Sequence, residues 1–263
     1  MRKIVGKPSW CLCALAVWRT LAIEPSDAGW KTYETAIGGS EHFVLNNDIT
    51  VQLNTNTRLR TSVTGISSTV TIDRGEAFFQ VGGSPLQVVV HNVPMSSINT
   101  SFSVRDYGNG NADIVPLHGL VHIGPVPGDR ADHVVSAGQI AAVRDERVVV
   151  QNLGHSSIQR KLMWRYGMLE FVDETVDGAV SEFNRYNRTR VVVDDPAIGC
   201  RRIGGRFSLS DSDVFVATVS RIFDLHTATS QTSTGAVIHL GRIPREVTTN
   251  TSSCAPKNVY QKE

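Results

Sequence analysis

The sequence has little charge of either sign and none of the compositional signs of a special architecture. Charged residues make up 19% of the 263 positions, and 26 basic residues balance 25 acidic ones. A net charge of +1 gives no electrostatic attraction to nucleic acid or to an anionic membrane surface, so neither is expected as a partner. With 22 glycines, 10 prolines and no repeat of 20–50 residues, collagen-like, low-complexity and helical-solenoid chains are excluded.

Cysteine is also scarce, with four in the whole chain. Cys11 and Cys13 lie in an apolar stretch, whereas Cys200 and Cys254 have no Cys or His neighbour at metal-ligand spacing. No metal site is therefore expected. The pattern favours isolated thiols; the alternative, a Cys200–Cys254 disulfide, requires a domain outside the cytoplasm.

Catalytic signatures are missing. The chain has no G-x-S-x-G elbow, Walker loop, G-x-G-x-x-G turn or H-E-x-x-H helix. His118 and His122, taken as members of one strand, would stand about 13 Å apart, too far for one metal ion to bridge. We therefore expect neither an enzyme nor a bound cofactor.

The N-terminus combines a basic start with an apolar run. Arg2, Lys3 and Lys7 precede nine apolar residues at 10–18, as in the first two regions of a secretory signal. A membrane-spanning helix needs about 20 apolar residues, and Arg19 interrupts this run. We expect residues 1–29 to be a signal-like segment or a marginal membrane anchor that exports the rest. The alternative is a tail that docks on the first domain.

From residue 30 to residue 151 the chain reads as a series of short strands separated by turns. Period-two alternation and turn signals every eight to twelve residues predict an all-β domain. The strand candidates are residues 51–53, 69–73, 79–81, 86–90, 101–105, 120–123, 139–143 and 147–151.

After residue 151 the periodicity changes. Residues 152–163 are polar and predict a linker, and residues 246–263 predict a polar tail. Between them, residues 164–245 predict a small α+β module of order β-α-β-β-α-β-β, so the whole chain is expected to be mainly β. One helix has its apolar face at Val176, Val180 and Phe183, and a second is expected to start with Ser210 as its N-cap. The strand candidates are residues 168–172, 189–193, 206–209, 227–230 and 236–240.

Several segments together resemble the FecR-type anti-sigma regulators. The most specific is IDRGEAFFQV at residues 72–81, which is similar to the family pattern L-x-x-GEA-x-F-x-V. Asn47 departs from the usual DGS turn, and Asn99 stands where the family has glycine. The other matching segments are residues 30–38 (WKTYETAIG), 43–57, 100–104, 164–171 (WRYGMLEF), 182–187 (EFNRYN) and 205–207.

The matching residues have structural rather than catalytic character. Gly75 permits a tight turn, while Ala77 and Phe79 alternate with Glu76 and Phe78 along a strand. These motifs therefore predict a fold and not a reaction centre.

The resemblance implies a FecR domain followed by a short secretin/TonB-type signalling module. Members of this family sit in the inner membrane and relay the state of a TonB-dependent outer-membrane receptor to an extracytoplasmic-function sigma factor. We therefore expect a periplasmic sensor in iron or siderophore signalling, whose partner is the receptor's signalling domain. Because the usual cytoplasmic helical domain does not precede residue 1, a sigma factor is expected as a partner only through an upstream or separate chain. The alternatives are a stand-alone structural or binding β domain of the envelope, and a truncated regulator without output.

One strand of the second module is the candidate partner-binding site. A small sheet leaves an edge with unpaired backbone groups, to which an extended partner strand can add. Arg206, Phe207 and Leu209 are the residues chosen, with Arg206 facing solvent and Phe207 packed inward. The alternative is a central strand in which all three residues only hold the fold together.

Overall fold

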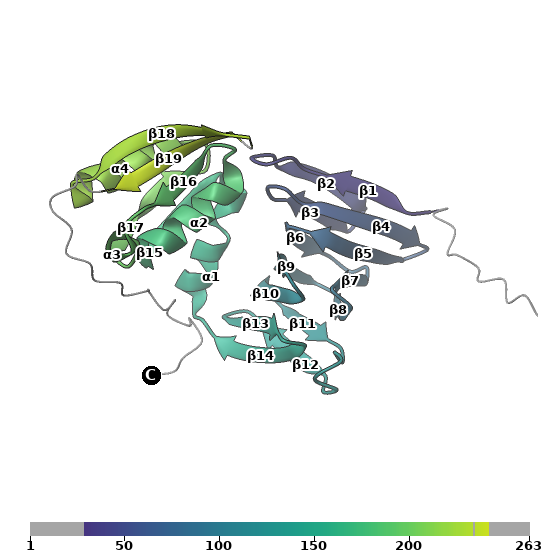
Figure 1. Ribbon diagram of the computed structural model, residues 1–263. Coiled ribbons are helices and arrows are strands. Elements are labelled where there is room, and N and C mark those ends of the chain that lie inside the picture. The colour runs from purple at the N-terminus through teal and green to yellow at the C-terminus, as the bar shows by residue number, and fades with distance from the viewer. Residues whose placement is uncertain (1–28, 234, 242–263) are drawn as a thin grey trace, which may run out of the picture.

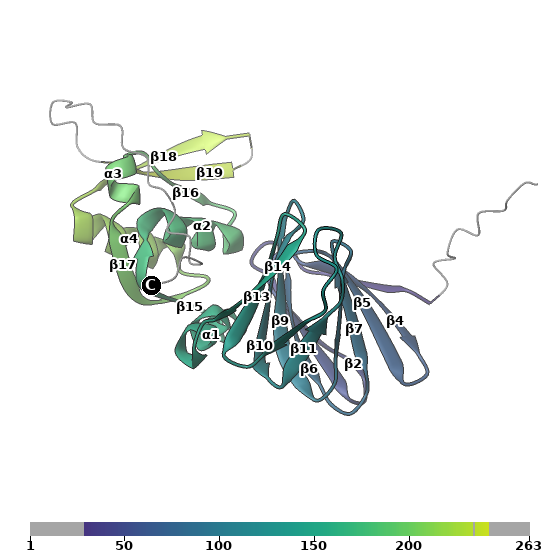
Figure 2. The same ribbon diagram turned by 90° about the horizontal axis from the view of Figure 1, so that it is seen from below.

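The computed structural model describes residues 29–233 and 235–241, which form two modules packed against each other (Figures 1 and 2). Within these residues the first module is built from strands alone, and the second combines helices with short strands. The expected mainly β fold, with an all-β module followed by a small α+β module, is confirmed.

Two seven-stranded sheets make up the first module. In spatial order, one sheet contains β1 (Lys31–Glu34), β4 (Arg58–Thr64), β5 (Ser67–Arg74), β7 (Leu86–Val90), β8 (Val93–Ser97), β11 (Leu120–Ile123) and β12 (His133–Ser136). The other contains β14 (Arg147–Asn152), β13 (Gln139–Arg144), β10 (Asn111–His118), β9 (Thr100–Gly108), β6 (Glu76–Val81), β3 (Ile49–Leu53) and β2 (Glu41–Asn46). All neighbouring pairs in these sheets are antiparallel except β5 and β7.

All eight predicted strands of this module are present, but six further strands were not predicted: β1, β2, β4, β8, β10 and β12. Strand β10 shows one cause, because five consecutive residues, 112–116, are buried and leave no alternation to detect. His118 ends β10 and His122 lies in β11 of the other sheet, so treating them as one strand was wrong.

The first core lies between the two sheets. Its fully buried side chains include Phe79 and Phe102, whose ring centroids are 5.2 Å apart, together with Leu59 and Ile123 from the opposite sheet. Apolar burial of this size is the main driving force for the module's folding.

The outer face of the second sheet is covered as well. Alternation along β6 would normally leave Glu76 and Phe78 at a solvated face, yet they are only 5% and 3% exposed. Phe78, Val115 and Ile140 belong to a second apolar cluster that is otherwise built from the second module. The two modules therefore share a core across this face.

The second module has the predicted order, with additions. Its elements are α1 (His155–Lys161), the 3₁₀ helix η1 (Met163–Tyr166), β15 (Met168–Thr175), α2 (Val176–Tyr186), β16 (Arg190–Val193), α3 (Pro196–Gly199), β17 (Arg202–Ser208), α4 (Ser212–Phe223), β18 (His226–Thr232) and β19 (Gly235–Gly241). The predicted polar linker at residues 152–163 is wrong, because it forms α1 and buries Ile158 and Leu162. Ser210 is not the N-cap of α4; that position is Asp211, whose side chain makes no capping hydrogen bond.

Two small sheets flank the helices of this module. Strands β15 and β17 pair with each other, and β19 lies between β16 and β18. Helix α2 contacts both sheets, and Phe183 on it stacks on Phe215 of α4 with ring centroids 4.1 Å apart. Phe171 and Phe207 complete this aromatic core.

Several predictions concern residues at or beyond the ends of the described chain. The signal-like segment, apart from Gly29, and the polar tail at 246–263 lie outside the described residues, as does the Cys200–Cys254 pairing. Cys200 itself is disulfide-bonded, so the isolated-thiol interpretation is wrong for this residue. In the part of the chain that the structure describes, no helix is long and apolar enough to cross a membrane.

We expect Gly75→Val to destabilise the first module strongly. Gly75 turns the chain from one sheet into the other with φ of +94°, and a Cβ there would lie 2.5 Å from the Thr57 Cα. Strain and the backbone clash together cost on the order of 2–5 kcal/mol of unfolding free energy. Gly65→Ala is the matched control, since Gly65 has φ of +61° with no atom within 4 Å of an added Cβ. Equal losses in thermal melts of both variants would contradict the role of close packing at Gly75.

Candidate functional site

The structure places the three sequence-predicted residues as expected for a strand with one exposed face. The Arg206 side chain is 57% exposed and lies 3.3 Å from a carboxylate oxygen of Glu170 on β15. Phe207 is buried in the aromatic core, and Leu209, just beyond β17, packs partly buried against the same core. The three residues thus form no single surface, and of the three Arg206 has the side chain that is exposed to a partner.

Strand β17 lies at the edge of its sheet. It pairs with β15 on one side, and among the described residues no strand pairs with its other side. The docking role of this edge remains a prediction.

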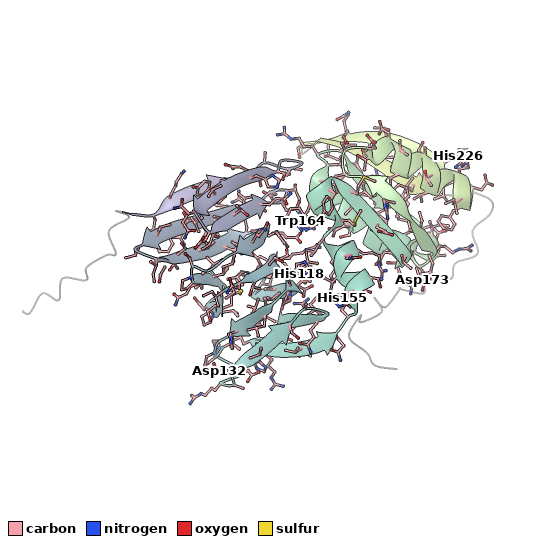
Figure 3. The ribbon with its side chains drawn as sticks, turned by 180° about the vertical axis from the view of Figure 1, so that it is seen from behind. His118, Asp132, His155, Trp164, Asp173 and His226 are labelled. Atoms are coloured by element: carbon pink, nitrogen blue, oxygen red, sulfur yellow. The ribbon has the colours of Figure 1, made fainter. Side chains whose placement is uncertain are left out.

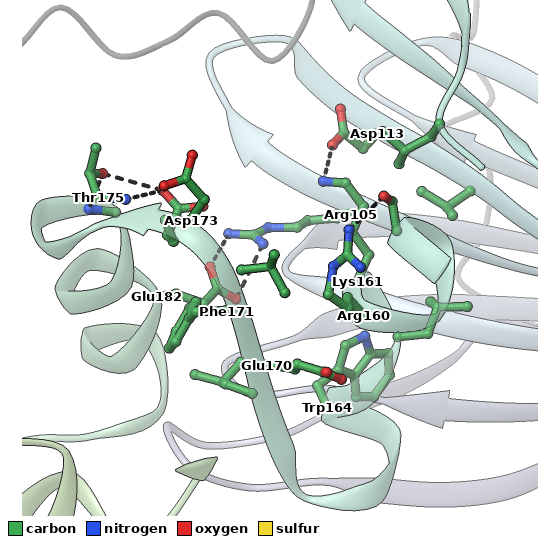
Figure 4. A pocket seen from close by; sticks show the side chains of 18 of the residues that line it. Arg105, Asp113, Arg160, Lys161, Trp164, Glu170, Phe171, Asp173, Thr175 and Glu182 are labelled. Atoms are coloured by element: carbon green, nitrogen blue, oxygen red, sulfur yellow. Dashed lines mark hydrogen bonds and ion pairs between the residues drawn. The ribbon is translucent and has the colours of Figure 1, made fainter. Parts of the chain in front are cut away.

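A charged cluster at the junction of the two modules was not anticipated. It consists of Glu76 on β6, Arg105 on β9, and Glu182 and Arg185 on α2. Arg105 donates to Glu182 over 2.9 Å, and Arg185 donates to Glu76 over 2.9 Å and also to Glu182 (Figure 4 shows the Arg105–Glu182 pair). The first module contributes Glu76 and Arg105, and the second contributes Glu182 and Arg185. Each buried charge of one module is therefore neutralised by a side chain of the other module.

The electrostatics of the cluster favour the charged forms. Burial opposes ionisation of Glu182, but Arg105 and Arg185 outweigh burial and lower the pKa of this carboxyl to about 2. Burial likewise disfavours the charge of Arg185, yet Glu182 and Glu76 raise the pKa of its guanidinium. Glu182 and Arg185 therefore remain charged at neutral pH.

Neutral hydrogen bonds extend the junction. Asn54 donates to the Tyr186 hydroxyl over 2.9 Å, and the Thr55 hydroxyl donates to the carbonyl oxygen of Arg185 over 3.0 Å. Nearby, the Arg165 guanidinium lies 3.5 Å from the centroid of the Phe78 ring. The two hydrogen bonds fix the orientation of α2 on the sheet, and the contact of Arg165 with Phe78 brings η1 against the same sheet.

The residues at this junction come from the motifs that carry the family resemblance. Glu76 belongs to the GEA segment and Asn54 to the residue 43–57 segment, while Glu182, Arg185 and Tyr186 belong to EFNRYN. Sequence reasoning found the motifs but missed that they meet. The available signal was a glutamate directly followed by three apolar residues, Ala77, Phe78 and Phe79, since a glutamate buried among such residues needs a cationic partner.

Beside the cluster a cleft of about 920 Å³ opens between the modules, and Figure 3 shows Trp164 where they meet. Strand β15 forms one wall and α1 contributes Arg160 and Lys161 from another (Figure 4). The apolar lining consists of Val115, Leu153, Leu162, Trp164, Leu169, Phe171 and Val172. Within residues 29–233 and 235–241, no group of three His, Cys, Asp or Glu side chains could hold a metal ion.

We expect Glu182→Gln to lower the unfolding free energy by about 2–3 kcal/mol at neutral pH, because it leaves two largely buried guanidinium groups with one carboxylate. The pKa of Glu182 falls from 4.5 to about 2 on folding, so its contribution is present above about pH 4.5. It is lost as the pH falls toward 2, and the difference between wild type and variant should shrink there in urea melts. Glu146→Gln, on the far hairpin between β13 and β14, is the control and should change stability little. A difference that stays constant down to pH 2 would contradict the assignment.

Comparisons with known proteins agree with this architecture. Residues 31–122 match the FecR protein family. Two crystal structures of a proposed anti-sigma factor from Parabacteroides distasonis superpose with TM-scores of 0.64 and 0.63, each at 17% identity. The similarity covers 81% and 82% of this chain and all of the other chain in each case.

No curated protein matches the sequence. At 17% identity the two structures show a shared fold that extends over both modules, and the family match covers most of the first. The chain is therefore FecR-like: residues 31–122, within the first module, match the FecR family, and a charged junction joins this module to a small α+β module.

Proposed function

We propose that this chain is the periplasmic sensor part of a FecR-like transmembrane regulator. In this role it binds the signalling domain of a TonB-dependent outer-membrane receptor and relays the state of that receptor, in iron or siderophore signalling, to an extracytoplasmic-function sigma factor. The observation that carries the proposal is the FecR match at residues 31–122 together with a fold shared, over both modules, with a proposed anti-sigma factor. Contact with the sigma factor itself would require a cytoplasmic domain, either upstream or in a separate chain.

The disulfide at Cys200 supports the location. Disulfides persist in oxidising compartments such as the periplasm and are rare in the cytoplasm. The basic start and apolar run before residue 29 supply a means of export and of anchoring in the inner membrane.

The second module supplies the proposed receptor-binding surface. The free edge of β17 offers unpaired backbone groups to an incoming strand, and Arg206 stands beside it with more than half of its side chain exposed. Its pairing with Glu170 is a surface interaction of about 0–1 kcal/mol, so a partner carboxylate can replace Glu170 at little cost.

We expect Arg206→Glu to weaken binding of the purified receptor signalling domain about tenfold or more, because reversing the charge replaces attraction by repulsion. Its melting temperature should change little, since the side chain is exposed. Titration calorimetry and thermal melts measure the two effects separately.

The matched control is Arg147→Glu, which makes the same charge change at an exposed position on β14 of the first module. It should bind as wild type does. Wild-type affinity of the Arg206 variant would contradict this docking edge, and no binding by the wild-type chain would contradict the receptor as partner.

Export gives an independent test. A fusion of residues 1–40 to a reporter that is active only in the periplasm should be active, because positive charge before the apolar run retains that end in the cytoplasm. Replacing Leu15 and Val17 by aspartate should abolish the activity. An inactive parent fusion would contradict export by this segment.

A further inference from the structure

The cleft between the modules has the features of a strand-binding groove. Residues 169–175 of β15 all line it, including neighbours whose side chains point to opposite faces of the strand. If a face of β15 lined the cavity, only every second residue would do so. Because consecutive residues line it, the edge of β15 faces the cavity. Figure 4 shows β15 running along the cleft opposite the first module.

The backbone groups of Glu170 on this edge have no strand partner among the described residues. The N–H of Leu209 donates to the carbonyl of Gly167, which makes this a hydrogen-bonded pair of the antiparallel ladder. By alternation Leu169 and Phe171 also bond to β17, whereas the N–H and C=O of Glu170 point away from it. Among the described residues no strand pairs with this side of β15.

A second feature points to a ligand with carbonyl groups. Trp164 is 5% exposed and lines the cleft, and its indole nitrogen has no hydrogen-bond acceptor among the described residues. In Figure 4 this nitrogen is turned toward the middle of the cavity. A buried donor without an acceptor is costly, and a peptide carbonyl entering the cleft would satisfy it.

One end of the cleft is acidic and favours a cationic group there. Asp173, Glu174 and Asp177 line that end and form no ion pair with any described residue. Burial raises the pKa of the Asp177 carboxyl, as expected where no cation compensates it. Arg202 is nearby but donates to the carbonyl oxygen of Asp173 rather than to a carboxylate.

We propose that this cleft binds an extended basic segment of a partner protein, which adds a third strand to the β15–β17 sheet at the free edge of β15. Its backbone pairs with Glu170, one of its carbonyl oxygens accepts from Trp164, and its cationic side chains lie beside Asp173 and Asp177. The site is separate from the β17 edge and does not depend on the receptor being the partner.

The probe is a fluorescein-labelled peptide of nine residues in which valine and lysine alternate, followed by fluorescence anisotropy with the full chain. We expect saturable binding. A peptide with glutamate in place of lysine should not bind, because of repulsion. A valine–lysine peptide whose alternate backbone nitrogens are methylated keeps its charge but loses the donors for one strand edge, and it should not bind either.

Two variants locate the site. Trp164→Phe keeps the aromatic packing and removes only the unpartnered donor, so it should weaken binding about fivefold to tenfold without lowering the melting temperature. Asp173→Asn with Asp177→Asn, both exposed, should weaken binding about tenfold. Glu41→Gln on β2 removes one carboxylate away from the cleft and should leave the affinity unchanged.

The proposal would be overturned if the wild-type chain failed to bind the valine–lysine peptide. If the methylated peptide bound as tightly as the unmethylated one, binding would rest on charge attraction alone and strand addition would be ruled out. Wild-type affinity in the aspartate double variant, which does not disturb the core, would place the peptide elsewhere on the molecule.

Discussion

The arrangement of the molecule depends on one buried group of charges at the module junction. Glu76 lies buried on the outer face of the second sheet, and Arg185 of the second module donates to its carboxylate. Arg105 is in the converse position, since its carboxylate partner Glu182 belongs to the other module. Separation of the modules would expose the shared apolar cluster and leave both residues without their ionic partners, which makes the two modules one unit.

Buried ion pairs contribute more to orientation than to net stability, because desolvation cancels much of their attraction. The apolar surface around Phe78, Val115 and Ile140 would tolerate α2 in several positions, since hydrophobic contact has no preferred direction. Directional contacts, in contrast, permit only one position of α2. They are the bidentate contact of Arg105 with Glu182 and the hydrogen bond of Asn54 to Tyr186. A displacement of α2 must therefore break several directional contacts at once, which favours discrete arrangements of the modules over continuous sliding.

Sequence reasoning recovered what depends on local pattern. Alternation revealed strands such as β5 and β9, and the apolar face of Val176, Val180 and Phe183 revealed α2. It failed where tertiary contact overrides pattern. Strand β10 is buried across five consecutive residues because a module covers the sheet that holds it.

Tertiary contacts that leave no local pattern also explain why helix α1 and the module junction were not predicted. Residues 155–161 look polar, and only Ile158 is buried among them, so the sequence alone has no apolar stripe to report. Glu76 and Glu182 are 106 residues apart, and no local rule connects an acid on a strand with an acid on a distant helix through shared arginines. The candidate strand β17 was found because it is local, whereas the cleft exists only once both modules are in place.

The junction also connects the two proposed binding edges of the β15–β17 sheet with the first module. Strand β15 leads directly into α2, so an event at either edge of the β15–β17 sheet acts on the helix that carries Glu182 and Arg185. These side chains contact Arg105 on β9 and Glu76 on β6, two neighbouring inner strands of the second sheet of the first module. A strand added to β15 would stiffen the start of α2, while a partner at Arg206 would compete for Glu170 on the same strand. Both proposed binding events would therefore act on α2, the helix whose Glu182 and Arg185 contact the first module.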